Sequence, residues 1–119
     1  MSRELIFLVS APAAESGLPA SVPCHIKVSP SGEGDPIVAF VSEDLGRQFV
    51  AGRALVGSLS VLAYSKLEAH AAKNLRAGRV LLFERSEQIA KYLKDGSNFD
   101  FARHIVSFED ATRRLQTAL

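Results

Sequence analysis

The amino-acid sequence predicts an α+β fold. We expect a single domain with a mixed β-sheet of five or six strands, in which an N-terminal antiparallel meander is followed by alternating helices and strands. Two observations predict this fold. The first three strand-like runs follow one another without a helix between them, which is typical of antiparallel strands. After them, an apolar run, a serine and a helix-like stretch recur, with the serines at positions 42, 65, 86 and 107. Only the class of residue repeats, which indicates strand–helix units rather than a solenoid.

The N-terminal third contains the three runs that lack intervening helices. Leu5–Val9 is apolar throughout and is a predicted strand. Pro23–Val28 alternates polar and apolar residues and is predicted to be a second strand with one face inward. Ser10–Val22 contains two prolines and a glycine, and Ser29–Pro36 is rich in turn-forming residues, so both are predicted to be loops.

The clearest strand–helix unit is Ile37–Gly52. Its first five residues are β-branched, aromatic or small, which favours a strand covered on both faces, with Phe40 in the core. Ser42 is expected to cap a helix that begins with two acids. Gly52 is expected to end this helix in a left-handed conformation. Gly46 is expected to weaken it by about 1 kcal/mol relative to alanine.

Three further units complete the chain. In the second, Ser65 and Glu68 have the spacing of a capping box, and Gly78 is expected to end the helix. Ser86 and Gly96 are expected to begin and end the third helix. The predicted strands of these units are Leu59–Ala63, Val80–Phe83 and Ile105–Phe108.

Composition narrows the class of protein. A chain of 119 residues with 47% hydrophobic and 23% charged residues predicts one globular domain, 1–119. The net charge of +1 gives no general attraction to nucleic acid or membranes, and neither partner is expected. The short apolar run near Met1 does not match a signal peptide, and no run has the length of a membrane span. With one cysteine in the chain, a cytoplasmic location is expected.

The segment IVAFVSEDLGRQFV, residues 37–50, resembles a motif of the SseB-like N-terminal domain family. That motif reads Val/Ile-x-Phe-Thr/Ser-Ser-x-x-x-Leu. The flanking order of elements is also similar, with strands before the segment and alternating helices and strands after it. The Asn-Pro-Gly-like turn of that family is replaced here by Glu84-Arg85-Ser86. The resemblance implies an accessory or interaction domain, and it carries over no site residues.

No set of residues predicts catalysis. Cys24 and His25 are neighbours on a predicted strand, so their side chains point to opposite faces and cannot form a thiolate–imidazole pair. His70 flanks an apolar helical stripe, and His104 opens the fourth strand near Asp100 without an evident nucleophile. The histidines lack metal-ligand spacing, and the glycines lack a nucleotide-binding fingerprint. We therefore expect no enzyme activity, no metal and no cofactor.

The most unusual stretch is Asp95–Arg103, in which aromatic residues alternate with polar ones outside any clear element. Phe99 and Phe101 either cover one end of the core, which is the favoured interpretation, or form an exposed apolar spot. In the second case, the partner-binding residues would be Phe99, Asp100 and Phe101.

The leading hypothesis for function is a non-catalytic module that binds a protein partner or itself, with a homodimer slightly favoured. The sheet is expected to leave an edge unpaired, and Leu5–Val9 would pair with a second copy if it lay there. The alternative is a ligand-binding or enzymatic pocket at the C-terminal ends of the strands. Its candidate residues are Ser42, Ser65, Ser86 and His104.

Overall fold

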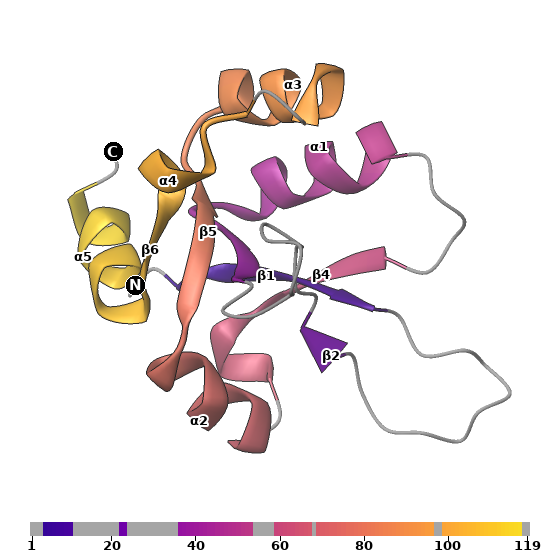
Figure 1. Cartoon of the computed structure of the whole chain (residues 1–119). Coiled ribbons are helices and arrows are strands. Elements are labelled where there is room, and N and C mark those ends of the chain that lie inside the picture. Colours follow the sequence, from indigo (N-terminus) through magenta and orange to yellow (C-terminus); the bar gives the residue numbers. More distant parts are fainter. Residues whose placement is uncertain are drawn as a thin grey trace, which may run out of the picture.

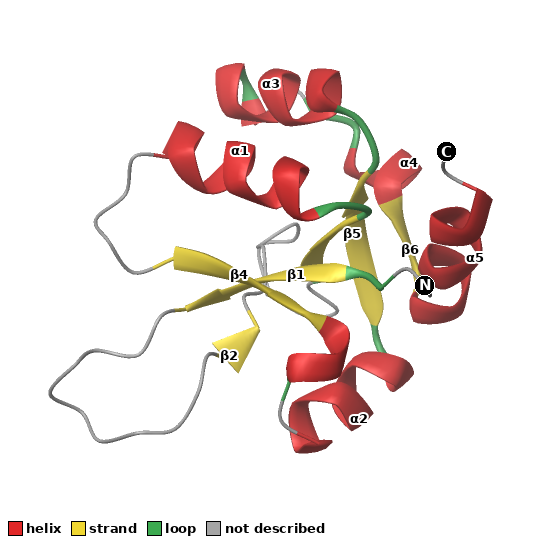
Figure 2. Cartoon of the chain, turned by 180° about the vertical axis from the view of Figure 1, so that it is seen from behind, coloured by secondary structure: helices red, strands yellow, loops and turns green. Residues whose placement is uncertain are grey.

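The computed structural model describes residues 4–10, 22–23, 36–53, 59–67, 69–96 and 99–117. These residues form one mixed sheet with helices on both faces (Figure 1, Figure 2). In chain order the elements are β1 (Ile6–Ser10), β2 (Val22–Pro23), β3 (Ile37–Phe40), α1 (Glu43–Arg53), β4 (Leu59–Ala63), the 3-10 turn η1 (Tyr64–Lys66), α2 (Ala69–Ala77), β5 (Arg79–Phe83), α3 (Ser86–Lys94), α4 (Phe101–His104), β6 (Ile105–Ser107) and α5 (Phe108–Thr117).

Strand β1 lies in the middle of the sheet. It pairs antiparallel with β4 on one side and with β3 and β2 on the other. Strand β5 runs parallel to β3, and β6 pairs antiparallel with β5. The α+β class and the mixed sheet are therefore confirmed. The N-terminal strands are antiparallel as expected, but β3 pairs directly with β1, so their order is not that of a simple meander.

The core has two halves, one on each face of the sheet, because alternate strand residues point to opposite faces. Helices α1 and α3 cover the face that carries Phe40 and Phe83, and they lie side by side (Figure 1). Helices α2 and α5 pack over the opposite face, which carries Phe7 and Leu82. Burial on both faces explains why the strands read as continuous apolar runs.

Ser42 caps a helix as predicted, and Ser107, which lies in the predicted strand Ile105–Phe108, caps another. The hydroxyl oxygen of Ser42 accepts from the N–H of Leu45 over 3.3 Å at the start of α1. Ser107 does the same for the N–H of Asp110 over 3.1 Å at the start of α5. The capping prediction for Ser65 is wrong, because Ser65 lies in η1, before α2 begins at Ala69. Ser86 begins α3 as predicted, with Arg85 at the cap position.

The glycines of α1 have a different role from the one predicted. Gly46 faces the sheet, and a Cβ atom there would lie 2.7 Å from Cγ1 of Val61. Gly52 lies within α1, which continues to Arg53, and its backbone is not left-handed. A Cβ atom at Gly52 would meet the Cδ1 atom of Leu93 on α3. Both glycines are therefore positions of close approach, and the predicted left-handed helix end at Gly52 is wrong.

Several predictions fall outside the described residues. They are the second strand beyond Pro23, the loops at 11–21 and 29–35, the capping role of Glu68, and the packing of Cys24 and His25. The structure does report on Asp95–Arg103, where a one-turn helix, α4, begins at Phe101. Among the described residues, no helix is long and apolar enough to cross a lipid bilayer.

Candidate functional site

The register of the sheet brings the C-terminal ends of the parallel strands to one edge, as expected for the alternative hypothesis. Ala63 is aligned with Ile6, which is aligned with Phe40, and Phe40 is aligned with Phe83. Ser42, Ser65, Ser86 and His104 follow or adjoin these aligned positions. Ser42 binds the Leu45 N–H, Ser65 binds Glu4, and His104 binds Gln88. These contacts do not converge, so the four residues do not form one pocket.

Ser65 and Glu4 form a clasp at one end of the β1–β4 pair, where β1 begins and β4 ends. The Glu4 carboxylate accepts from the backbone N–H of Ser65 over 2.8 Å and from its hydroxyl over 3.0 Å. This contact follows from the antiparallel register, which places the residue before Leu5 beside the residue after Tyr64. The serine that resembles a helix cap in the sequence is thus a partner of a distant carboxylate.

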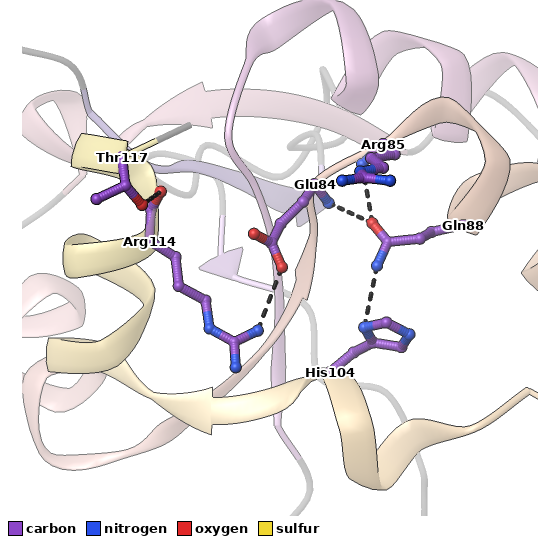
Figure 3. A network of polar contacts seen from close by, with 6 residues as sticks. All are labelled: Glu84, Arg85, Gln88, His104, Arg114 and Thr117. Atoms are coloured by element: carbon purple, nitrogen blue, oxygen red, sulfur yellow. Dashed lines mark hydrogen bonds and ion pairs between the residues drawn. The ribbon is translucent and has the colours of Figure 1, made fainter. Parts of the chain in front are cut away.

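The most connected polar group lies where β5 ends (Figure 3). The Glu84 carboxylate accepts from Arg114 of α5 over 3.2 Å. The Gln88 side-chain oxygen accepts from the backbone N–H groups of Glu84 and Arg85, over 2.6 Å and 2.8 Å. The Gln88 side-chain nitrogen lies 3.0 Å from Nδ1 of His104 (Figure 3). Gln88 therefore caps the start of α3 and also holds the imidazole.

This arrangement fixes the protonation state of His104. The two backbone donors hold the Gln88 oxygen, so its NH₂ group must donate to Nδ1 of His104. Nδ1 can accept only in the neutral imidazole with its proton on Nε2. Partial burial, which includes the Phe99 ring 5.0 Å away, lowers the pKa of His104 below 6.5. The carboxylates of Asp100 and Glu84 oppose this shift, whereas Arg114 and Arg103 add to it.

The lowered pKa of His104 predicts a pH-dependent stability. The unfolded chain takes up a proton on His104 more readily than the folded chain, so the stabilisation is present above about pH 6.5 and is lost as the pH falls through the folded-state pKa. Urea unfolding at about pH 7.5 and pH 5.5 measures the loss. His104→Asn keeps an acceptor near Nδ1 but does not titrate, and it should lose less stability than the wild type. Equal losses in the two proteins would show that His104 does not contribute.

Within this network the Gln88 amide, Nδ1 of His104 and one Glu84 carboxylate oxygen are used in contacts among its own residues. No buried side-chain donor or acceptor among the described residues lacks a partner. The described residues also contain no cluster of three or more His, Cys, Asp or Glu that could hold a metal ion. His70 is exposed and lies 3.4 Å from the side chain of Asn74. The network therefore ties β5, α3, α4 and α5 together.

The three residues predicted to bind a partner lie beside this network. Phe99 is 5% exposed and packs against Phe83 and Tyr92, which agrees with the favoured core interpretation. Phe101 is half-buried against Phe99, with ring centroids 5.3 Å apart. Asp100 is exposed and lies 3.6 Å from Arg103. A partner could reach Asp100 and part of Phe101, and their binding role stays a prediction.

Two adjoining hollows on the face of the sheet that α2 and α5 cover share Phe108 and Thr112 as lining residues. One has a volume of about 190 Å³ and is also lined by Glu4, Leu5, Tyr64 and Leu115. The other, of about 450 Å³, is also lined by Arg76, Glu109 and Arg113. The charged groups on these walls already have partners, since Arg76 donates to the Tyr64 hydroxyl over 2.7 Å and Arg113 pairs with Asp110 over 2.7 Å. These hollows therefore offer few free groups for recognising a ligand.

The surface that the sequence reasoning missed is the outer edge of β4, the side of Leu59–Ala63 that faces away from β1. Strand β4 pairs only with β1 among the described residues, and α1 packs over one of its faces. Ser60 is exposed, while Val61, Leu62 and Ala63 are half-buried. None of the five residues is charged, so the edge lacks the charged side chains that commonly prevent strand addition.

The hydrogen-bond pattern shows which backbone groups this edge presents. The N–H of Tyr64 donates to the carbonyl of Leu5 over 3.0 Å, one residue beyond the strand. Bonds alternate along an antiparallel pair, so Ser60 and Leu62 direct their backbone groups toward β1. Val61 directs both its N–H and its C=O outward, and no described residue accepts or donates there. Ala63 directs its N–H outward, whereas its carbonyl accepts the first bond of η1. The sequence does show that Leu59–Ala63 is an uncharged, mostly apolar run. It does not show that the strand lies at an edge, because this depends on which distant strands pair with it.

A hollow of about 400 Å³ lies along this edge between α1 and β4. Val50 and Ala51 of α1 line it together with Ser60 and Val61 of β4, and Glu43 and Arg47 also contribute to its wall. Glu43 and Arg47 form an exposed ion pair of 2.8 Å. The outer edge of β4 thus combines free backbone groups with an adjacent recess whose wall is partly apolar and partly polar.

Comparison of the chain with family models, with curated proteins and with solved structures finds no match. The resemblance of residues 37–50 to the SseB-like family therefore stays a prediction, and the function must be argued from the chain itself.

Proposed function

We propose that this chain is a non-catalytic protein-interaction module that binds an extended segment of a partner protein along the outer edge of β4. The observation that supports it is the outward-directed N–H and C=O of Val61 and the outward-directed N–H of Ala63, in a strand without charge. An added strand would satisfy these groups, and side chains would supply selectivity. The hollow beside α1 would receive apolar side chains of the added strand. A cytoplasmic location belongs to the same proposal.

Strand addition fits the chain better than a catalytic pocket at the C-terminal ends of the strands. The polar side chains at those ends are occupied by the Gln88–His104 contact and by the clasp between Glu4 and Ser65. The outer edge of β4, by contrast, has donors and acceptors that no described residue uses. Main-chain hydrogen bonds of an added strand would provide affinity without any catalytic group.

The test uses a substitution that blocks the outer edge and leaves the inner ladder intact. Ala63 has φ −68° and ψ 149°, which proline adopts without strain. Ala63→Pro removes an outward N–H and places the ring where an added strand would pair, while the bonds of Ser60 and Leu62 to β1 remain. Ala63→Ser is the matched control because it keeps the N–H group. Urea unfolding of both variants checks that the fold is retained.

Displayed random peptides of about twelve residues can be selected on the wild-type chain. We expect the selected peptides to bind Ala63→Pro about tenfold more weakly than the wild type, and to bind Ala63→Ser with little change. Selection of no peptide, or binding that proline leaves unchanged, would contradict the proposed function.

A further inference from the structure

We propose, building on the proposed function, that the partner at the outer edge of β4 is a second copy of this chain, paired antiparallel across a two-fold axis at Val61. A two-fold interface requires one surface to complement itself. The backbone pattern, the charge and the position of β4 meet this requirement.

The backbone groups match when Val61 of one copy lies opposite Val61 of the other. Ala63 then lies opposite Leu59 of the second copy, and the reverse holds by symmetry. These are the positions that face outward, although the Ala63 carbonyl is used in η1. The Val61 pair exchanges two bonds and each pair of Ala63 with Leu59 contributes one, so the register would form about four hydrogen bonds. It uses the whole length of β4, and the sheets of the two copies become continuous.

The side chains next to this axis do not repel a second copy. Leu59–Ala63 has no charged residue, and like charges opposite one another are the usual obstacle to self-pairing. The wall of the hollow carries one acid, Glu43, and one base, Arg47. These two charges pair with each other within α1, so the rim presents no net charge that would repel a second copy.

The other exposed edge fits a second copy less well. Strand β6 has three residues, Ile105–Ser107, and α5 follows it immediately. The most apolar strand, β1, is excluded because it lies between β3 and β4, so the prediction that it would form an edge pair does not apply. Strand β4 is therefore the longest edge strand among the described residues.

Sedimentation of the wild type from about 10 µM to about 1 mM tests the assembly, because an interface based on one short strand is expected to be weak. We expect the mean mass to rise toward that of a dimer. Ala63→Pro should remain monomeric, and Ala63→Ser should behave as the wild type. A wild type that is monomeric throughout would overturn the second-copy proposal, and so would a dimer that Ala63→Pro leaves intact.

Cysteine cross-linking tests the axis. In a Cys24→Ser background, Val61→Cys should form an intermolecular disulfide under mild oxidation, because Cα atoms of directly opposed residues lie about 5.5 Å apart. Ser60→Cys is the control, since residue 60 is more exposed but its two copies would be about 8 Å apart in this register. Cross-linking at 60 that equals or exceeds cross-linking at 61 would overturn the proposed axis.

The two proposals fail separately. If selected peptides bind in a way that Ala63→Pro abolishes while the wild type stays monomeric, strand addition stands and the second-copy proposal is wrong. If peptide binding is insensitive to Ala63→Pro while the wild type still dimerises through residue 61, a foreign strand is not the ligand and the second copy is the sole partner at this edge.

Discussion

Replacing Phe83 by Ala is expected to lower the free energy of unfolding by about 3–5 kcal/mol, because it removes the ring at the centre of the aromatic-rich core cluster beneath α1 and α3. Phe83 is 0% exposed. Its ring lies 5.7 Å from that of Phe40 and 5.5 Å from that of Phe49. It also lies 5.8 Å from the rings of Tyr92 and Phe99. These rings come from β3, α1, α3 and the segment before α4, so a cavity at position 83 weakens contacts among four elements.

Urea unfolding of the variant and the wild type measures this loss. Phe83→Leu is the matched control, because it keeps an apolar side chain of intermediate volume and should lose about 1–2 kcal/mol. A loss below about 1 kcal/mol for Phe83→Ala would mean that the site can collapse around the missing ring, and that the cluster is not closely packed.

The strands could be predicted from the sequence because burial on both faces leaves a simple pattern. Val80–Leu82 are all 0% exposed, and such a run is apolar at every position. The pairing of the strands could not be predicted in the same way. Whether Leu5–Val9 lies at an edge or in the centre depends on which distant strands pair with it, and the apolar run is the same in both cases. For the same reason, the sequence does not predict that β4 is an edge strand.

The serines show a similar limit. A Ser before an acidic helix start caps the helix at Ser42 and Ser107, where the local chain alone decides the contact. At Ser65 the distant Glu4 carboxylate binds the backbone N–H and the hydroxyl. At the start of α3 the Gln88 side chain supplies the cap from within the helix. Local spacing predicts local contacts, and it fails where a distant residue competes.

The aromatic stretch illustrates how a candidate site changes with the fold. In the sequence, Phe99 and Phe101 alternate with polar residues, which is compatible with an exposed spot. In the structure, Phe99 completes the cluster around Phe83, while Phe101 remains half-buried at its rim. The surface proposed to bind a partner is instead the outer edge of β4. Its free backbone groups could not be predicted from the amino-acid types in this strand.

Gly46→Ala is expected to lower the free energy of unfolding by about 1–2 kcal/mol, the opposite of what helix propensity predicts. Propensity alone favours alanine by about 1 kcal/mol in a helix interior. The added methyl group, however, would lie 2.7 Å from Cγ1 of Val61 and 3.2 Å from Cδ2 of Phe40. Val61 is β-branched and held in β4, so it cannot move away without shifting α1 from the sheet.

Gly52→Ala is the matched control in the same helix. Its added methyl group would meet only the end of the Leu93 side chain, which can change rotamer, and Gly52 is exposed. We expect Gly52→Ala to be neutral or to stabilise the fold by up to about 1 kcal/mol, so the two variants should differ by about 2–3 kcal/mol. Urea unfolding of both compares them directly. If Gly46→Ala stabilised the chain as much as Gly52→Ala, the close packing of α1 against β4 would be wrong, and the hollow between them would have another shape.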